Sequence, residues 1–359
     1  MNTHQKFLFA LLIAALLCAP ALASLPDANR MEEIGQRAAY TALSELQFSK
    51  GDPGVMVLTN AGRAVVNGQT TERAISGITK ISGLQNGDST LWTVNRAEWK
   101  PLWFYFYNKY TGKGLFLEPD TAVYTMSKAE FSQVSFDDTF STRALVIGDL
   151  LKIIADSDVG NQTRDALGGE SNSIISITNA WAHGAPYDLM AAAMLHNHLC
   201  PGLLGGYFPI KYVEKVLPIE NSAQSYTYIT TSTSCKEDAY PVLWDMTPGK
   251  GGAIVHSLSE NETAALKEEY GSSPRGIFVR WDSRAKSGTG IVFGSVTQAS
   301  TAENNVPEWA AKPYRVVMSM ATIDKPELSV STLKTFTIDQ ETLSELKSAA
   351  NPYSVIANL

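Results

Sequence analysis

The stretch Tyr187–Tyr207, YDLMAAAMLHNHLCPGLLGGY, decides how the second half of the chain folds and where its chemistry lies. Its first part is rich in Ala, Leu and Met, which are strong helix formers. Pro201 cannot continue that helix, but it suits the first position of a new one. We therefore expect one helix over Asp188–Leu199 and a second over Leu203–Leu217, with Cys200 at their junction.

The junction holds several side chains that can bind metals or act as nucleophiles. Two of the chain's five histidines, His196 and His198, lie there with Cys200, one of its three cysteines. The i, i+4 spacing of His196 and Cys200 allows them to share a helix face, whereas His198 joins them only where the backbone bends. Because a helix N-terminus favours negative charge, we expect a lowered pKa for the Cys200 thiol.

Residues 1–23 are typical of a secretory signal peptide. Lys6 gives a charged start, Phe7–Cys18 forms an apolar core, and Ala21–Ala23 is a small-residue cleavage site. No other stretch is long and apolar enough to cross a bilayer. We expect an exported protein that is periplasmic, extracellular or cell-surface and is not transmembrane after cleavage.

Composition excludes some classes of function. The net charge of −7 leaves no basic patch, which argues against nucleic acid binding. The mature length is typical of one large or two ordinary domains. Only Cys200 and Cys235 remain after cleavage, and in an oxidising compartment a single structural disulfide between them is one interpretation.

Two sequence echoes indicate an internal duplication. Thr111–Phe116 resembles Ser287–Phe293. Thr70–Ala74 occupies the position in the first half that Cys235–Ala239 occupies in the second. The first copy has no His or Cys at the matching positions. The predicted organisation is a signal peptide (1–23), a degenerate half (24–130), a helical and loop connection (131–184), a half with the site (185–300) and C-terminal strands with a helix (301–359).

Local patterns predict the elements between these motifs. We expect a helix over Thr142–Asp156, a loop or boundary over Ser157–Ser173 because that stretch is rich in Gly, Ser, Asn and Asp, and a strand over Tyr314–Ala321. The Gly-rich turn Pro248–Gly252 lacks the earlier Gly and the following Ser or Thr that a phosphate-binding loop requires.

A second group of polar residues follows in the chain. Cys235 precedes Glu237 and Asp238 at the start of a predicted helix. Two imidazoles and two thiols suit zinc or another borderline-soft transition metal. The spacing matches no zinc finger, because the paired C-x-x-C knuckles are missing.

Both regions resemble one known family. His196–Gly202, followed by Gly206 and Tyr207, closely resembles the His-Gly-His-x-Cys-Pro-Gly signature of the FmdE family of formylmethanofuran dehydrogenase proteins. Cys235–Ala239 and Thr247–Gly251 look like that family's Cys-x-x-Asp-Ala segment and the Thr-Leu-Gly-Lys-Gly turn that follows it. The two motifs keep the family's order and spacing.

The resemblance implies an α+β fold in which an antiparallel sheet is flanked by helices, and often a homodimer. It also implies a pocket near the motif His and Cys that binds a metal such as zinc. The residues that carry over as metal ligands are His196, His198, Cys200 and Cys235. Those that carry over or stand in as supporting groups are Asp238, Asp245, Thr247 and Lys250.

The chain departs from the family at two places. Asp245-Met246 stands where the family often has Gly-Cys, so one thiol is missing, and we expect Asp245 to substitute as an oxygen ligand. The chain also ends without the C-x-x-C tail that many members carry.

We interpret the chain as an exported FmdE-like metal-binding protein. If it is an enzyme, Cys200 and His198 are the candidate catalytic residues. Its expected partner is a metal or a small-molecule ligand. Two alternatives stay open: a thiol/disulfide redox protein that uses Cys200 and Cys235, and a non-catalytic binding module with a structural disulfide.

Overall fold

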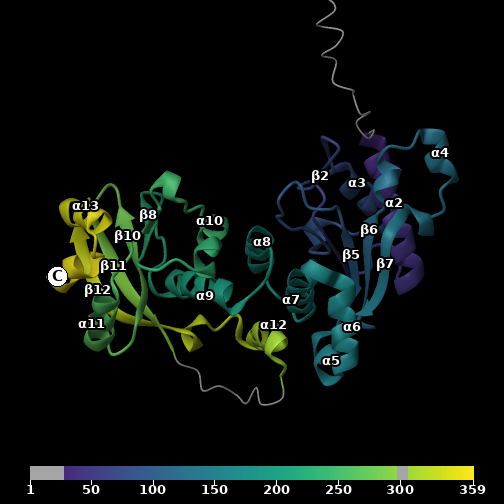
Figure 1. The fold of residues 1–359 in the computed structure, drawn as a ribbon. Helices are drawn as coiled ribbons and strands as arrows, with labels where there is room; N and C mark the ends of the chain where they lie inside the picture. The colour runs from purple at the N-terminus through teal and green to yellow at the C-terminus, as the bar shows by residue number, and fades with distance from the viewer. Residues whose placement is uncertain (1–27, 297–305) are drawn as a thin grey trace, which may run out of the picture. The chain divides into compact units, whose positions relative to one another are not determined.

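The computed structural model describes residues 28–296 and 306–359 (Figure 1). The predicted signal peptide, 1–23, lies outside the described residues. The chain forms two compact units, one of residues 28–106 and Leu115–Leu145, the other of Tyr107–Gly114 and Val146–Leu359. The domain boundaries predicted from sequence stay predictions. Among the described residues, no helix has both the length and the apolar character that crossing a bilayer would require.

The first unit is built on a five-stranded sheet of order β4-β1-β5-β6-β7, in which β1 and β4 run parallel. Buried apolar side chains of α2, α3 and the strands form its core. Its helices and strands are α2 (Ala28–Leu46), β1 (Val55–Thr59), β2 (Val65–Val66), β3 (Gln69–Thr70), α3 (Arg73–Ser82), β4 (Leu91–Thr93), β5 (Phe104–Asn108), β6 (Lys113–Pro119), α4 (Lys128–Gln133) and β7 (Phe140–Ile147).

The second unit contains a sheet of order β9-β8-β10-β11-β12. Neighbours run antiparallel except β8 and β9, which are parallel. Its elements are α5 (Leu150–Ala155), α6 (Ser157–Leu167), α7 (Ser171–Ala182), α8 (Tyr187–His196), α9 (Pro201–Val216), β8 (Gln224–Thr230), the 3-10 turn η5 (Cys235–Asp238), α10 (Ala239–Leu243), η6 (Pro248–Lys250), β9 (Ala253–Val255), α11 (Glu260–Tyr270), β10 (Pro274–Asp282), β11 (Ser287–Ser295), α12 (Glu308–Ser319), β12 (Val330–Asp339), α13 (Gln340–Ser348) and α14 (Pro352–Ala357).

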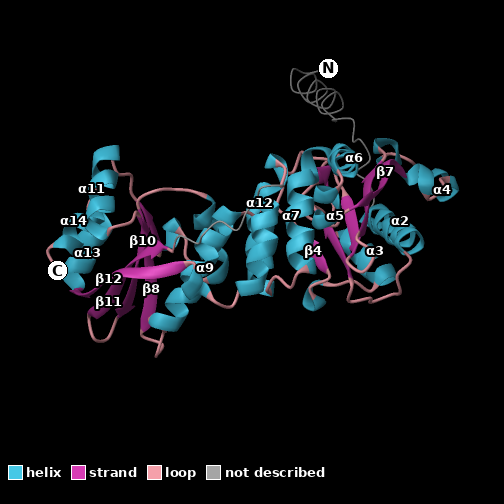
Figure 2. Cartoon of the chain, turned by 90° about the horizontal axis from the view of Figure 1, so that it is seen from below, coloured by secondary structure: helices cyan, strands magenta, loops and turns pink. Residues whose placement is uncertain are grey.

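Helices cover both faces of this second sheet (Figures 1 and 2). On one face, Ile229, Ile277 and Phe336 pack with residues of α11, α13 and α14. On the other, Tyr228 stacks against Tyr240 of α10, and Phe278 meets the same ring edge to face. Helices together with two five-stranded sheets confirm the predicted α+β class.

Three of the predicted elements are wrong. The stretch 142–156 is the end of strand β7 followed by α5, which begins where Asp149 Oδ1 accepts the N–H groups of Leu151 and Lys152. The predicted loop over 157–173 is α6 and the start of α7. The polar composition of this stretch favoured a loop, but Asp156 is an N-cap. Its carboxylate accepts two N–H groups at the start of α6.

The predicted strand over 314–321 is the end of helix α12. Its Tyr and Val residues favour a strand by propensity. Ala310, Pro313, Val316 and Val317 are buried, however, and their spacing gives one apolar face of a helix. Tertiary packing of that face outweighs the strand preference.

The two units share one topology. In each, a helix leads into the second strand of the sheet, a helix follows, and the edge strand returns parallel to it. Thr59 and Thr230 occupy the same register at the ends of β1 and β8, and each accepts the N–H two residues on, from Ala61 and Ser232. These correspondences agree with the predicted duplication, which stays a prediction.

The hairpin turns also correspond. Asn108 Oδ1 accepts the N–H groups of the second and third turn residues in 109–112, and Asp282 Oδ1 does so in 283–286. The last turn position is left-handed in both, with φ of 73° at Gly112 and 54° at Lys286. A side chain is strained in that conformation and glycine is not.

We therefore predict that Lys286→Gly raises the free energy of unfolding by about 0.5–1 kcal/mol, because relief of strain outweighs the added freedom of the unfolded chain. Urea denaturation measures the change. Ala285→Gly, one residue earlier where φ is not positive, is the control and should lower stability. Equal losses in both variants would contradict this explanation.

Candidate metal centre

The loop between α8 and α9 places the first two site residues. Helix α8 ends at His196, and Asn197 adopts a left-handed conformation with φ of 61° that turns the chain. Two serines of α7 secure the loop: Ser173 Oγ donates to the Asn197 carbonyl at 2.5 Å, and Ser176 Oγ accepts the Leu199 N–H at 3.0 Å. The predicted bend therefore exists, and it is held from outside the motif.

Cys200 is the N-cap of α9. Its Sγ accepts the N–H of Leu203 at 3.4 Å, and Pro201 occupies the first helical turn, as expected from the sequence. The sulfur therefore lies at the start of the helix, facing the turn that carries the second cysteine.

Two glycines allow that turn to approach α9. An added Cβ on Gly202 would lie 2.8 Å from Cys235 Cβ, 3.2 Å from Cys235 Sγ and 3.4 Å from Cys200 Sγ. An added Cβ on Gly206, one helical turn later, would overlap the carbonyl oxygen of Lys236. The face of α9 that meets η5 must therefore lack side chains at both positions.

The result is a compact group of donors. The nearest ligand atoms of His196, Cys200 and Cys235 all lie within 4.8 Å of one another. His196 Nε2 is 3.6 Å from Cys200 Sγ. A tetrahedral zinc ion, with Zn–N of about 2.0–2.1 Å and Zn–S of about 2.3 Å, would separate such a pair by about 3.6 Å. The donor set and this spacing fit a metal.

Asp238 orients the imidazole. Its Oδ2 lies 2.7 Å from His196 Nδ1. A carboxylate can only accept, so Nδ1 carries the proton and the lone pair of Nε2 points toward the sulfurs. Carboxylates hold metal-binding histidines in the same way in many proteins.

The other predicted site residues lie elsewhere. The half-buried ring of His198 packs beside that of His196, with centroids 4.3 Å apart and planes inclined by 33°, but His198 is not a member of the donor group. Asp245 forms an exposed ion pair with Lys250. Thr247 caps η6, its hydroxyl accepting the Lys250 N–H at 3.3 Å. The roles predicted for these four residues stay predictions.

The comparison with protein families agrees with this geometry. Residues 195–328 match the family model described as FmdE, Molybdenum formylmethanofuran dehydrogenase operon. Residues 195–328 are FmdE-like. The matched segment contains all three donors and confirms the resemblance inferred from the motifs. No curated protein matches the chain.

Sequence reasoning missed the structural roles of Lys236 and Glu237 beside the donor group. Lys236 is buried, and its Nζ donates to the Ser232 carbonyl and pairs with Glu237, each at 2.5 Å. Glu237 also accepts the N–H of Ser234 at 2.6 Å and closes a capping box. The spacing Ser-x-x-Glu was a readable signal for that box. Gly202 and Gly206 belong to the motif that carries the resemblance, but the close approach that requires them appears only in the folded chain.

The expectation of an acidic Cys200 thiol is wrong. Burial raises the pKa of Cys200 to about 11, and the nearby Cys235 adds to the rise. The N–H groups of Gly202 and Leu203 act in the opposite direction but do not outweigh burial. Both cysteines are free thiols.

We predict that Gly202→Ala weakens metal binding by at least about tenfold, since the new methyl group displaces Cys235 from its partners. Competition against a chromophoric chelator measures the affinity. Gly205→Ala is the matched control, because an added Cβ there meets only Lys236 Cβ at 4.0 Å. Equal affinities in the two variants would show that the close approach is unimportant.

Proposed function

We propose that this protein is an exported metal-binding protein that holds a transition metal, most simply zinc, through His196 Nε2 and the thiolates of Cys200 and Cys235. The observation that carries the proposal is the His196 ring, turned by Asp238 so that Nε2 faces the sulfur of Cys200. The pattern of residues 1–23 supports export.

Three protein donors favour a site that also accepts a ligand. Structural zinc sites close with four protein donors, whereas catalytic sites keep one position open. The group within the described residues has three donors. A metal bound there would supply Lewis acidity or an activated water molecule.

His198 suits a role beside the metal ligands. Its ring packs against His196 and stays partly accessible. In the proposed site, His198 holds or moves a proton for a molecule that binds next to the donors. Asp238 acts through His196 by keeping the proton on Nδ1.

The burial of the Cys200 thiol favours metal binding over thiol redox chemistry. A redox nucleophile reacts as the thiolate. Its thiol therefore needs a pKa near or below the surrounding pH, so that a useful fraction is ionised. Burial keeps Cys200 protonated at neutral pH. A metal ion compensates for that burial because it supplies positive charge directly to the sulfur.

We predict about one zinc ion per chain after anaerobic purification and zinc reconstitution, measured by elemental analysis. His196→Gln and Cys200→Ala should lose the metal, because each removes a donor. Asp238→Asn should weaken binding by about 10–100-fold, since the outer partner of the imidazole changes. Glu327→Gln, which alters an exposed carboxylate paired with Lys215, is the control. A metal-free wild type, or unchanged binding in Cys200→Ala, would refute the proposal.

We further predict that zinc affinity rises with pH. The Cys200 thiol is protonated at neutral pH because its pKa is raised, and metal binding must displace that proton. Affinity should increase by about tenfold per pH unit for each proton released. Chelator competition at several pH values measures the slope. Cys200→Asp, whose carboxyl group is already ionised, should show a shallower slope, and an identical slope would contradict the assignment.

A further inference from the structure

A cavity in the second unit lies away from the metal centre. This open cavity has a volume of ≈ 660 Å³, and its lining includes Glu214 at the C-terminal end of α9. Cys200 lies at the opposite end of that helix, about 20 Å away at a rise of about 1.5 Å per residue. The cavity is within the usual size range for small-molecule sites, which is about 300–1,000 Å³.

The cavity lies beside the first residues of strand β8, which within the described residues have no neighbouring strand on the side where β9 pairs with the later residues. Strand β9 pairs only with Tyr228–Thr230. Tyr228 donates its N–H toward that side, to the Gly252 carbonyl at 2.8 Å. Because peptide groups alternate along an antiparallel ladder, the N–H and C=O of Tyr226 face the same side, where no strand residue of the described chain pairs with them. The cavity therefore offers an adjacent backbone donor and acceptor.

One wall is apolar and rigid. The rings of Tyr226 and Trp244 stack with centroids 4.2 Å apart and planes inclined by 14°. Trp244 Nε1 donates to Glu214 at 2.9 Å, and the Tyr226 hydroxyl donates to the Leu217 carbonyl at 2.5 Å. Both rings are thus held in place before any ligand binds, which lowers the entropic cost of binding.

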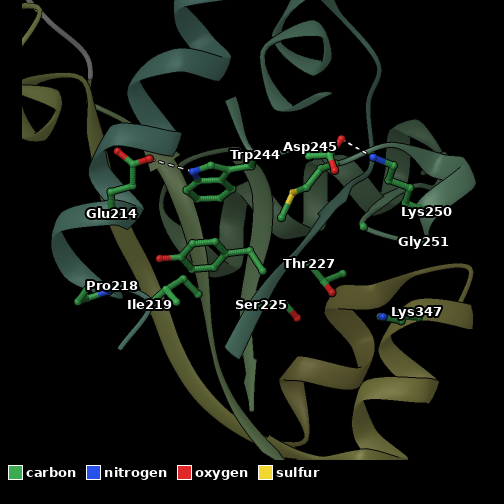
Figure 3. A pocket seen from close by; sticks show the side chains of 13 residues that line it. Glu214, Pro218, Ile219, Ser225, Thr227, Trp244, Asp245, Lys250, Gly251 and Lys347 are labelled. Carbon is green, nitrogen blue, oxygen red and sulfur yellow. Dashed lines mark hydrogen bonds and ion pairs between the residues drawn. The ribbon is translucent and has the colours of Figure 1, made fainter. Parts of the chain in front are cut away.

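The opposite wall is polar. Side chains alternate across a strand, so Ser225 and Thr227 project from the face opposite Tyr226, toward α13 and its Lys347 (Figure 3). Figure 3 shows Lys347 on this side, apart from Trp244 and Glu214. The cavity therefore wraps around the uncovered edge of β8, with aromatic rings on one side and hydroxyls with an ammonium group on the other.

The charge that lacks a partner in this cavity is positive. Glu214 binds Trp244 and also pairs with Lys211 at 3.0 Å. Asp245 pairs with Lys250. Within residues 28–296 and 306–359, Lys347 makes no ion pair or side-chain hydrogen bond. A ligand with an anionic group would supply an ion-pair partner for the Lys347 ammonium group.

We propose that this cavity binds a small acylated amino acid with an aromatic side chain and a free carboxylate. The amide of such a molecule pairs with the backbone edge at Tyr226, as an added strand would. Its aromatic group lies against the wall of Tyr226 and Trp244, and its carboxylate meets Lys347. The assignment is independent of the proposed metal donors, because His196, Cys200 and Cys235 do not line the cavity.

Calorimetric titration of the full chain with three probes tests the proposal. N-acetyl-L-phenylalanine contains all three groups, N-acetyl-L-phenylalaninamide lacks the charge, and 3-phenylpropanoate lacks the amide. The first should bind at least about tenfold more tightly than either of the others, because a hydrogen bond to a charged group or a backbone pair is lost in each.

Variants separate the contributions. Lys347→Gln should bind N-acetyl-L-phenylalanine and its amide equally. Trp244→Ala should bind both probes more weakly. Lys267→Gln, which makes the same charge change on exposed α11, should bind as the wild type does. Metal content should stay unchanged in Lys347→Gln, which distinguishes this site from the metal centre. Absence of binding by all three probes, or wild-type preference for the acid in Lys347→Gln, would overturn the proposal.

Discussion

The near-contact between α9 and the turn Cys235–Asp238 is the constraint on which the metal centre depends. Gly202 and Gly206 leave room for the backbone of that turn, where any side chain would collide with Cys235 or with the carbonyl of Lys236. The donors come from segments separated by strand β8, so only packed tertiary structure brings them together. Bringing these segments together costs conformational entropy. Burial of the surrounding apolar side chains, rather than the donors themselves, offsets that cost.

Three consecutive residues of the turn Cys235–Asp238 make different stabilising contacts. Lys236 enters the interior and satisfies the Ser232 carbonyl, Glu237 caps the start of the turn, and Asp238 aligns the imidazole of His196. Burial lowers the pKa of Lys236, and its partner Glu237 opposes that shift. These contacts hold the turn, and with it Cys235, beside Cys200.

Residue chemistry and helix-ending signals made much of the site predictable. The histidine and thiols were recognisable as soft-metal donors, and Pro201 marked the start of a helix capped by Cys200. The acidity of that thiol was not predictable, because burial is a property of the fold and reverses the effect of the helix terminus. Strand propensity misled at 314–321 for a related reason, since packing of one helical face decided the outcome. The edge of β8 left open by short β9 has no sequence signal at all.

The serine contacts made by α7 extend the site beyond its recognisable sequence. Ser173 and Ser176 hold the backbone of Asn197 and Leu199, yet both serines precede the FmdE-like segment at 195–328. A fragment cut at that boundary would retain every donor atom but would expose two backbone groups that the intact protein keeps satisfied. The smallest piece that could fold with its ligand loop in place therefore begins no later than α7, and recombinant fragments designed from motif boundaries alone would be too short.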